Sequence, residues 1–329
     1  MGRGTNMSRP TVLMSGPLSE EVTTACEARF ELIRLWEAPD YEALVAARGP
    51  EVLGIATGGH VGRVSAELME GLPNLQIVSN IGVGYDTVDV VEAARRGVIV
   101  TNTPGVLDDE VADSALGLLL MTVRELSQAE RYLRAGRWKG RPYRLTPNRL
   151  AGRRMGVLGL GRIGESIARR AQSFGVTVVY HNRREKDVPY RYYPNLLEMA
   201  QDIDILMVVA PGGAETRHLV DAEVLRALGP GGVLINIARG SVVDEPALIA
   251  ALQSGVIRSA GLDVFEHEPE VPQALIDMEH VVLLPHVGSA SVDTRRAMGQ
   301  LMVDNLATWF DTGRPLTPVA ETPEEGSPA

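Results

Sequence analysis

The sequence has very little cysteine, no long hydrophobic run and no basic cluster. Its single cysteine, Cys26, cannot form an internal disulfide bond. No stretch reaches the roughly 18 apolar residues that a membrane-spanning helix needs. Lys and Arg number 32 against 42 Asp and Glu, giving a net charge of −10, and no basic run is interleaved with aromatic residues. These features argue against a membrane protein or a nucleic-acid-binding surface and favour a cytoplasmic location.

The 329 residues instead carry the pattern of an α/β protein. Such a length usually folds as two domains of about 150 residues each. Short β-branched runs alternate with helical or polar stretches, which is typical of βαβ units and parallel sheets. The first series predicts strands at 11–16, 30–36, 51–58, 75–84 and 98–104. A second series begins near Arg153 and predicts strands at 154–161, 176–182, 204–211, 232–238, 259–265 and 280–286.

Three helical segments matter for the domain organisation. A stretch rich in Ala and Leu, from Asp109 to about Ala135, predicts a long helix that connects the two series. A helix after 154–161 is expected to bury one face, made of Ile163, Ile167, Ala171 and Phe174, and to stop at Gly175. A further helix over 291–311 follows the last strand and could cross back to the first domain.

A dinucleotide signal directly follows the strand at 154–158. The run Gly159-Leu160-Gly161-Arg162-Ile163-Gly164 opens the next helix, as a nucleotide-binding turn does. The first glycine permits the tight turn, the second lets the backbone approach a pyrophosphate, and the third allows close packing of helix on strand. The alternative is a glycine-rich turn in another kind of α/β protein. The strand before it and the helix after it favour dinucleotide binding.

The end of the second strand of this unit indicates the choice of coenzyme. An NAD-binding unit usually has an acidic residue there, which bonds the ribose hydroxyls. This chain has Asn182, followed by Arg183 and Arg184. Guanidinium groups suit a 2′-phosphate, which a carboxylate would repel. NADP(H) is therefore the preferred coenzyme, with NAD(H) possible, although two arginines at a strand end could also be a solvated loop.

Three charged residues follow late strands of the second series. Arg239 can hold the carboxylate of a 2-keto acid and polarise its carbonyl group. His286 can deliver or remove the hydroxyl proton, and Glu268 can orient the imidazole and favour its protonated form. The carboxyl ends of parallel strands share one edge, so the three can converge. Sequence spacing alone leaves Glu266 as an alternative to Glu268.

The other histidines are weaker candidates. Gly59 and His60, at a strand end of the first domain, could line a substrate pocket. No histidine or cysteine shows the spacing of a metal site, so no metal is expected.

Five segments together resemble the D-isomer-specific 2-hydroxyacid dehydrogenases over about residues 11–318, and especially their NADPH-dependent glyoxylate/hydroxypyruvate reductases. They are VTNTPGVLDDEVAD, GLGRIG, INIARGSVVDEPAL, AGLDVFEHEP and LLPHVGSAS. The resemblance implies two Rossmann-like or flavodoxin-like parallel-sheet domains with a cleft between them. The substrate-binding domain would be discontinuous, 1–104 plus 290–329, around a dinucleotide-binding domain at 105–289.

The resemblance also implies site residues. It assigns Arg239, Glu268 and His286 as the catalytic residues, and Arg239 and His286 as contacts of the substrate. The substrate carboxylate would also meet backbone N–H groups at Val83 and Gly84. Further cofactor-lining positions are Val111, Pro211, Ala238, Asp263 and Gly288. A departure is Gly212-Gly213, where many members carry Leu-Thr; this concerns the loop over the adenosine.

The predicted function is reduction of glyoxylate, hydroxypyruvate and similar 2-keto acids to D-2-hydroxy acids with NADPH. The alternative is a non-catalytic, dinucleotide-sensing scaffold of the same fold. A homodimer is expected, built through the helix from about Asp109 and the following arm with Trp138. Whether a partner's residue such as Trp138 lines the pocket stays open at this point.

Overall fold

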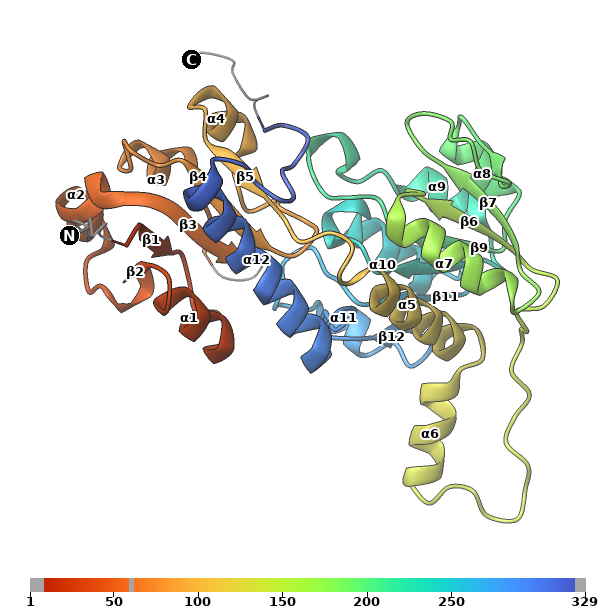
Figure 1. Cartoon of the computed structure of the whole chain (residues 1–329). Helices are drawn as coiled ribbons and strands as arrows, with labels where there is room; N and C mark the ends of the chain where they lie inside the picture. Colours follow the sequence, from red (N-terminus) through yellow and green to blue (C-terminus); the bar gives the residue numbers. More distant parts are fainter. Residues whose placement is uncertain (1–8, 59–61, 323–329) are drawn as a thin grey trace, which may run out of the picture. The chain divides into compact units, whose positions relative to one another are not determined.

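The computed structural model describes residues 9–58 and 62–322 (Figure 1). The chain divides into two compact units, each with its own parallel sheet. Unit 1 comprises the described residues of Met1–Leu107 and Ser291–Ala329, and unit 2 comprises Asp108–Ala290. Each unit is described by itself below.

Unit 1 has a five-stranded sheet in the order β2-β1-β3-β4-β5, with every strand pair parallel. This is the order of a flavodoxin-like fold. All five strands predicted from the β-branched runs are present, each shorter than the apolar run that signals it. Their bounds are β1 Thr11–Met14, β2 Glu31–Arg34, β3 Val52–Gly58, β4 Ile77–Ile81 and β5 Ile99–Thr101.

Helices cover both faces of this sheet because its strands are apolar on both sides. The helices α1 (Glu20–Glu27) and α12 (Val292–Thr312) pack on one face, with Met302 and Leu306 in the core. The other face is covered by α2 (Tyr41–Arg48), α3 (Ala66–Glu70) and α4 (Val90–Arg95). The helix predicted over 291–311 therefore does cross back to the first unit as α12. It packs on β4, where Ser79 Oγ donates to the Met302 carbonyl at 2.9 Å.

Unit 2 has a seven-stranded sheet in the order β12-β11-β10-β9-β6-β7-β8, again all parallel. Read from β8, this is the doubly wound order of dinucleotide-binding folds with one strand added. The fold class of two parallel-sheet α/β domains is therefore confirmed; the cleft between them stays a prediction. The strands are β6 Arg154–Leu158, β7 Thr177–His181, β8 Arg191–Tyr192, β9 Ile205–Val208, β10 Val233–Asn236, β11 Ser259–Leu262 and β12 Val282–Leu283.

Two helices, α5 and α7, pack on one face of the unit 2 sheet. At their contact Arg170 of α7 lies 2.6 Å from Asp113 and 3.0 Å from Asp109, both on α5. The opposite face carries α8, α9 and α10. The helices are α5 Asp108–Val123, α6 Leu126–Arg134, α7 Arg162–Gln172, α8 Leu196–Gln201, α9 Ala222–Leu228, α10 Glu245–Gln253 and α11 Gln273–Ile276.

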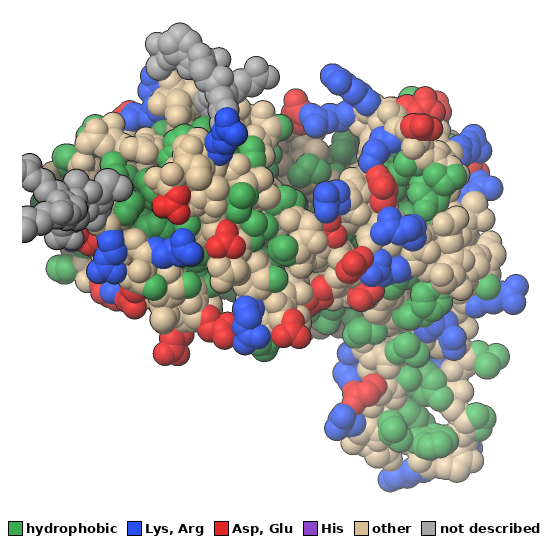
Figure 2. Space-filling model, in the orientation of Figure 1, with side chains coloured by type: hydrophobic (Ala, Val, Ile, Leu, Met, Phe, Trp, Pro, Cys, Tyr) green, Lys and Arg blue, Asp and Glu red, His purple; other side chains and the backbone are tan. Residues whose placement is uncertain are grey.

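The prediction of a single helix from Asp109 to about Ala135 is wrong. The chain breaks between α5 and α6, where Glu125 adopts a left-handed conformation with φ of 52°. The helix α6 and the loop that follows it extend away from the unit 2 sheet (Figure 1). Figure 2 shows hydrophobic side chains gathered over this projection. Its residues include four exposed large hydrophobic side chains, Leu126, Leu133, Trp138 and Leu145.

One smaller expectation also fails. Ile167 and Ala171 of α7 are buried as predicted, but Phe174 lies past the helix end and is 41% exposed. No helix within the described residues is long and apolar enough to span a bilayer.

Candidate active site

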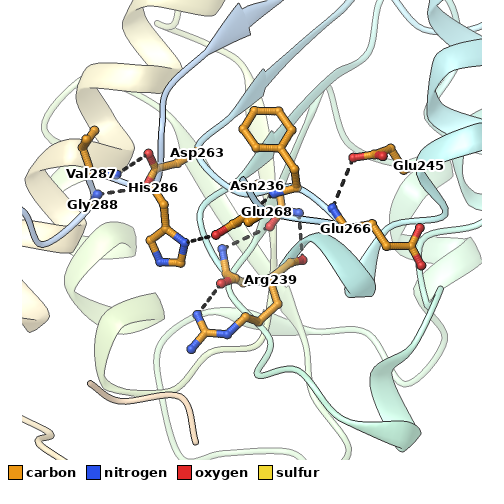
Figure 3. Close-up of polar contacts among 11 residues, drawn as sticks. Asn236, Arg239, Glu245, Asp263, Glu266, Glu268, His286, Val287 and Gly288 are labelled. Atoms are coloured by element: carbon orange, nitrogen blue, oxygen red, sulfur yellow. Dashed lines mark hydrogen bonds and ion pairs between the residues drawn. The ribbon is translucent and has the colours of Figure 1, made fainter. Parts of the chain in front are cut away.

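The candidate site lies at the carboxyl edge of the unit 2 sheet, where three neighbouring strands end. Arg239 follows β10, Glu268 follows β11 and His286 follows β12, and these strands are adjacent in the sheet. Figure 3 shows Arg239, Glu268 and His286 close to one another, with the Glu268 side chain directed at the imidazole. Adjacent parallel strands therefore bring together residues that are up to 47 positions apart in the sequence.

Glu268 and His286 form a hydrogen-bonded acid–base pair. Oε2 of Glu268 lies 2.7 Å from Nδ1 of His286, and the two side chains are 22% and 25% exposed. The other carboxylate oxygen of Glu268 accepts from the Phe265 N–H at 2.9 Å, which fixes its direction. With Nδ1 engaged, Nε2 is the nitrogen placed for proton transfer to a ligand.

The backbone of His286 is itself unusual. Its φ is 53°, a left-handed conformation that costs free energy for any residue with a Cβ atom. The N–H of His286 donates to the carbonyl of Asp263 at 2.9 Å, which holds this conformation. Strain of this kind is kept where the surroundings determine one side-chain direction, as at an active site.

Glu266, the alternative left open by the sequence, is engaged elsewhere. Its Oε1 lies 2.9 Å from Nε2 of His218 and 2.8 Å from Nη2 of Arg217. Burial opposes its ionisation, but the hydrogen bonds and charges of His218 and Arg217 outweigh that and lower the pKa of Glu266. Of the two carboxylates, the structure therefore pairs Glu268 with His286.

Arg239 lies in a loop whose backbone is fixed by hydrogen bonds to a buried side chain. The buried Asn236 donates through Nδ2 to the Arg239 carbonyl at 3.0 Å and accepts from the Ala238 N–H at 3.0 Å. The next residue, Gly240, packs directly on the Phe265 backbone: a Cβ atom there would lie 1.9 Å from the Phe265 carbonyl carbon. The loop that carries Arg239 thus touches the loop that carries Glu268, a contact that only glycine permits.

Asp263 joins the β11 and β12 ends. Its carboxylate accepts from the N–H groups of Val287 and Gly288, both at 2.8 Å. Burial raises the pKa of Asp263 above its ordinary value, although those two hydrogen bonds and the nearby His286 oppose the rise. A Cβ atom on Gly288 would lie 3.0 Å from the Asp263 carboxylate and 3.9 Å from the buried Val111. Three predicted cofactor-lining residues therefore lie together.

The glycine turn after β6 has the spatial properties that the motif requires. A Cβ atom on Gly159, whose φ is +98°, would meet the Ala210 backbone at 2.6 Å, and one on Gly164 would meet the Gly159 carbonyl at 2.5 Å. Around Gly161, by contrast, a Cβ atom would have no described neighbour within 4 Å. Gly161 also caps the amino end of α7. Open space at a helix amino end suits a pyrophosphate, so the residues fit a dinucleotide.

Asn182 and Arg183 have partners that the sequence did not reveal. Oδ1 of Asn182 accepts from the Leu160 N–H at 2.7 Å, so this side chain holds the glycine turn. Arg183, 84% exposed, lies 2.6 Å from Glu215 on the short helical turn at Ala214–Thr216, and Arg184 is exposed. Lys186, which the sequence analysis did not predict, donates to the Leu160 carbonyl at 3.1 Å and pairs with Glu165.

The remaining predicted cofactor positions also lie in unit 2. Ile163 is half-buried on α7, and Arg162 pairs with Asp108. Ala238 is buried, and Pro211 is exposed.

In unit 1, the loop after β4 carries the predicted backbone donors. The Val83 carbonyl accepts from Asn102 at 2.8 Å and the Gly84 carbonyl from the buried Asn80 at 3.0 Å. No described group accepts a hydrogen bond from the N–H of Val83 or Gly84. Gly59 and His60 lie outside the described residues.

Fold and site together define an α/β protein with a dinucleotide-binding unit and an Arg, a Glu and a His at the edge of its sheet. The sequence model of the D-isomer specific 2-hydroxyacid dehydrogenase NAD-binding domain matches residues 116–288. The chain belongs to the D-isomer-specific 2-hydroxyacid dehydrogenase family, whose named relatives here are reductases.

The relatives cover nearly the whole chain. Glyoxylate/hydroxypyruvate reductase A of Arabidopsis thaliana is 46% identical over 309 residues, 94% of this chain and 98% of the relative. Hydroxyphenylpyruvate reductase of Plectranthus scutellarioides is 46% identical over 310 residues, with the same coverage. Among solved structures, an NADPH-dependent glyoxylate/hydroxypyruvate reductase of Sinorhizobium meliloti, in complex with NADP and malonate, is 53% identical. It has a TM-score of 0.91, covering 96% of this chain and 98% of its own.

Proposed function

We propose that this protein reduces small 2-keto acids, such as glyoxylate and hydroxypyruvate, to D-2-hydroxy acids with NADPH. The observation that carries the proposal is the 2.7 Å contact between Glu268 and His286 beside the Arg239 loop, in a unit with a dinucleotide turn. The printed activities of the Arabidopsis and Sinorhizobium relatives support the same substrate class.

The chemistry follows from three side chains. Arg239 binds the substrate carboxylate through its guanidinium fork and polarises the neighbouring carbonyl group. His286 gives its Nε2 proton to the carbonyl oxygen, while Glu268 keeps Nδ1 bonded and so fixes the ring's orientation. The bound coenzyme supplies the hydride. In the reverse direction the same imidazole takes the hydroxyl proton.

The coenzyme would be held along the edge from β7 to β12. Its pyrophosphate would lie at the turn from Gly159 to Gly164, and Arg183 and Arg184 would meet the 2′-phosphate beside Asn182. The residues proposed to line its remaining parts are Val111, Pro211, Ala238, Asp263 and Gly288.

Unit 1 is the proposed substrate-binding domain, and unit 2 the dinucleotide-binding domain. The N–H groups of Val83 and Gly84 are the proposed backbone donors to the substrate carboxylate. The expected domain bounds, 1–104 with 290–329 and 105–289, belong to this proposal, as do the substrate contacts assigned to Gly59 and His60.

A homodimer in the cytoplasm is the proposed state of the protein. Its interface would form on α6 and the following loop, where Leu126, Leu133, Trp138 and Leu145 are 45%, 56%, 63% and 94% exposed. Exposed aromatic and leucine side chains on one projection are typical of a subunit contact. Light scattering at micromolar concentration tests this: a mass of twice 35.5 kDa supports it, and a mass near 35.5 kDa contradicts it.

The activity is tested by following NADPH absorbance with a panel of 2-keto acids. Turnover with glyoxylate or hydroxypyruvate, and none with a matched acid that lacks the keto group, supports the proposal. Binding of NADPH without turnover of any keto acid would instead favour the non-catalytic scaffold.

A further inference from the structure

His218 contacts both loops that carry the proposed catalytic side chains. It lies between the short helical turn at Ala214–Thr216 and α9, in a left-handed conformation with φ of 51°. Its backbone N–H donates to the Ser241 carbonyl at 2.8 Å, two residues beyond Arg239. Its Nε2 lies 2.9 Å from Oε1 of Glu266, two residues before Glu268. One residue therefore bonds the Arg239 loop through its backbone and the Glu268 loop through its side chain.

Glu266 is well suited to receive that contact. Its side chain is only 9% exposed, and its N–H donates to Oε2 of the buried Glu245 at 3.2 Å. Figure 3 shows Glu266 and Glu268 on one loop with their side chains pointing in opposite directions. Fixing Glu266 on one side of the loop thus restricts the rotation of the backbone that aims Glu268 at His286.

The two loops also depend on each other sterically. Gly240 lies so close to Phe265 that neither loop can shift toward the other. Phe265 in turn donates to the Glu268 carboxylate at 2.9 Å. A loss of the His218 contact would therefore be transmitted through two residues of backbone to Glu268, and through Ser241 to Arg239.

We infer that His218 is a positioning residue, which holds the Arg239 and Glu268 loops in register through Ser241 and Glu266. This inference rests on the proposed keto-acid reduction. The charged and titratable groups that face Glu266 are His218, Arg217 and Glu245. Arg217 is 57% exposed, whereas His218 is 33% exposed and alone adds the bond to Ser241.

The test is the steady-state kinetics of His218→Ala with hydroxypyruvate and NADPH. Misplacement of catalytic groups by less than an ångström should lower kcat/KM about tenfold. The KM for NADPH should stay unchanged, because the glycine turn is not touched. His218→Gln, which keeps a donor for Glu266, should recover most of the loss.

His267→Ala is the matched control, because this exposed histidine lies between Glu266 and Glu268 but its side chain makes no hydrogen bond among the described residues. It should keep wild-type kinetics. If His218→Ala does not fold, Glu266→Ala removes the same contact from the other side and should show the same loss of kcat/KM with an unchanged KM for NADPH. Wild-type kcat/KM in a folded His218→Ala, or a His218→Gln variant as impaired as His218→Ala, would overturn the inference. A wild-type protein that reduces no keto acid would instead refute the proposed function itself.

Discussion

The two units use the same strand edge in different ways. At the carboxyl edge of the unit 2 sheet, ionisable side chains are proposed to face the ligands. Buried groups hold the loops that carry them: Asn236 donates to the Arg239 carbonyl, and Asp263 accepts from the Val287 N–H. At the edge of the unit 1 sheet, the proposed donors are the backbone N–H groups of Val83 and Gly84, and Asn80 and Asn102 hold the carbonyls of these two residues. In the proposed function, unit 2 thus contributes side-chain chemistry, and unit 1 contributes backbone geometry.

This difference predicts different responses to mutation. A side chain that transfers a proton or binds charge cannot be replaced, so its removal should lower turnover by orders of magnitude. A backbone donor survives any nearby side-chain change that leaves the loop in place, so changes there should alter binding by small factors.

The largest effect is expected for Arg239→Ala. It removes both carboxylate binding and carbonyl polarisation, so kcat/KM for hydroxypyruvate should fall about 10³-fold. Arg239→Lys should recover little, because an ammonium group cannot form the bidentate contact. Arg258→Ala is the control, since this exposed arginine lies before β11, at the opposite edge of the same sheet, and should leave kcat/KM unchanged. Retention of activity in Arg239→Ala would contradict the assignment.

Coenzyme choice should show an intermediate effect. Wild-type kcat/KM should favour NADPH over NADH by about 10- to 100-fold, and less as salt rises, because Arg183 is 84% exposed and already paired with Glu215. Replacing Arg183 and Arg184 with Gln should erase most of the preference. Adding Asn182→Asp should favour NADH: the carboxylate can still accept from Leu160 N–H but repels a 2′-phosphate. Equal kcat/KM values for both coenzymes at low ionic strength would refute this prediction.

The smallest effect is expected in unit 1. Asn80→Ala removes the hydrogen bond to the Gly84 carbonyl and should raise KM for the keto acid about fivefold, the value of one hydrogen bond. Because no reacting group is lost, kcat should change little. Asn74→Ala, which removes an exposed contact to Pro50, serves as the control and should leave KM unchanged. A large fall in kcat for Asn80→Ala would show that unit 1 contributes more than backbone positioning.

Much of the fold could be predicted because buried parallel strands are continuous apolar runs. The run at 232–238, for example, contains β10, and the glycine motif marks the turn after β6. The break at Glu125 could not be predicted, since no glycine or proline marks it. The edge strand β8 was missed as well, because its two residues, Arg191 and Tyr192, carry no apolar pattern.

The site could be predicted in part. That Arg239, Glu268 and His286 lie near one another could be predicted, because each follows a strand that ends at the same edge. The choice between Glu266 and Glu268 depends on side-chain directions in an irregular loop, which spacing does not determine. The contact of Arg183 with Glu215 joins residues 32 positions apart on two different loops, so no local pattern indicates it.

The most direct test of the account is a single-turnover measurement on His286→Ala. The variant is first saturated with NADPH, which should bind with nearly wild-type affinity, and is then mixed rapidly with hydroxypyruvate while absorbance at the NADPH band is followed. Loss of the general acid should slow NADPH oxidation about 10²-fold or more relative to wild type, while His267→Ala reacts at the wild-type rate. Oxidation at the wild-type rate in His286→Ala, or an equal loss in His267→Ala, would contradict the assignment of His286 as the proton donor.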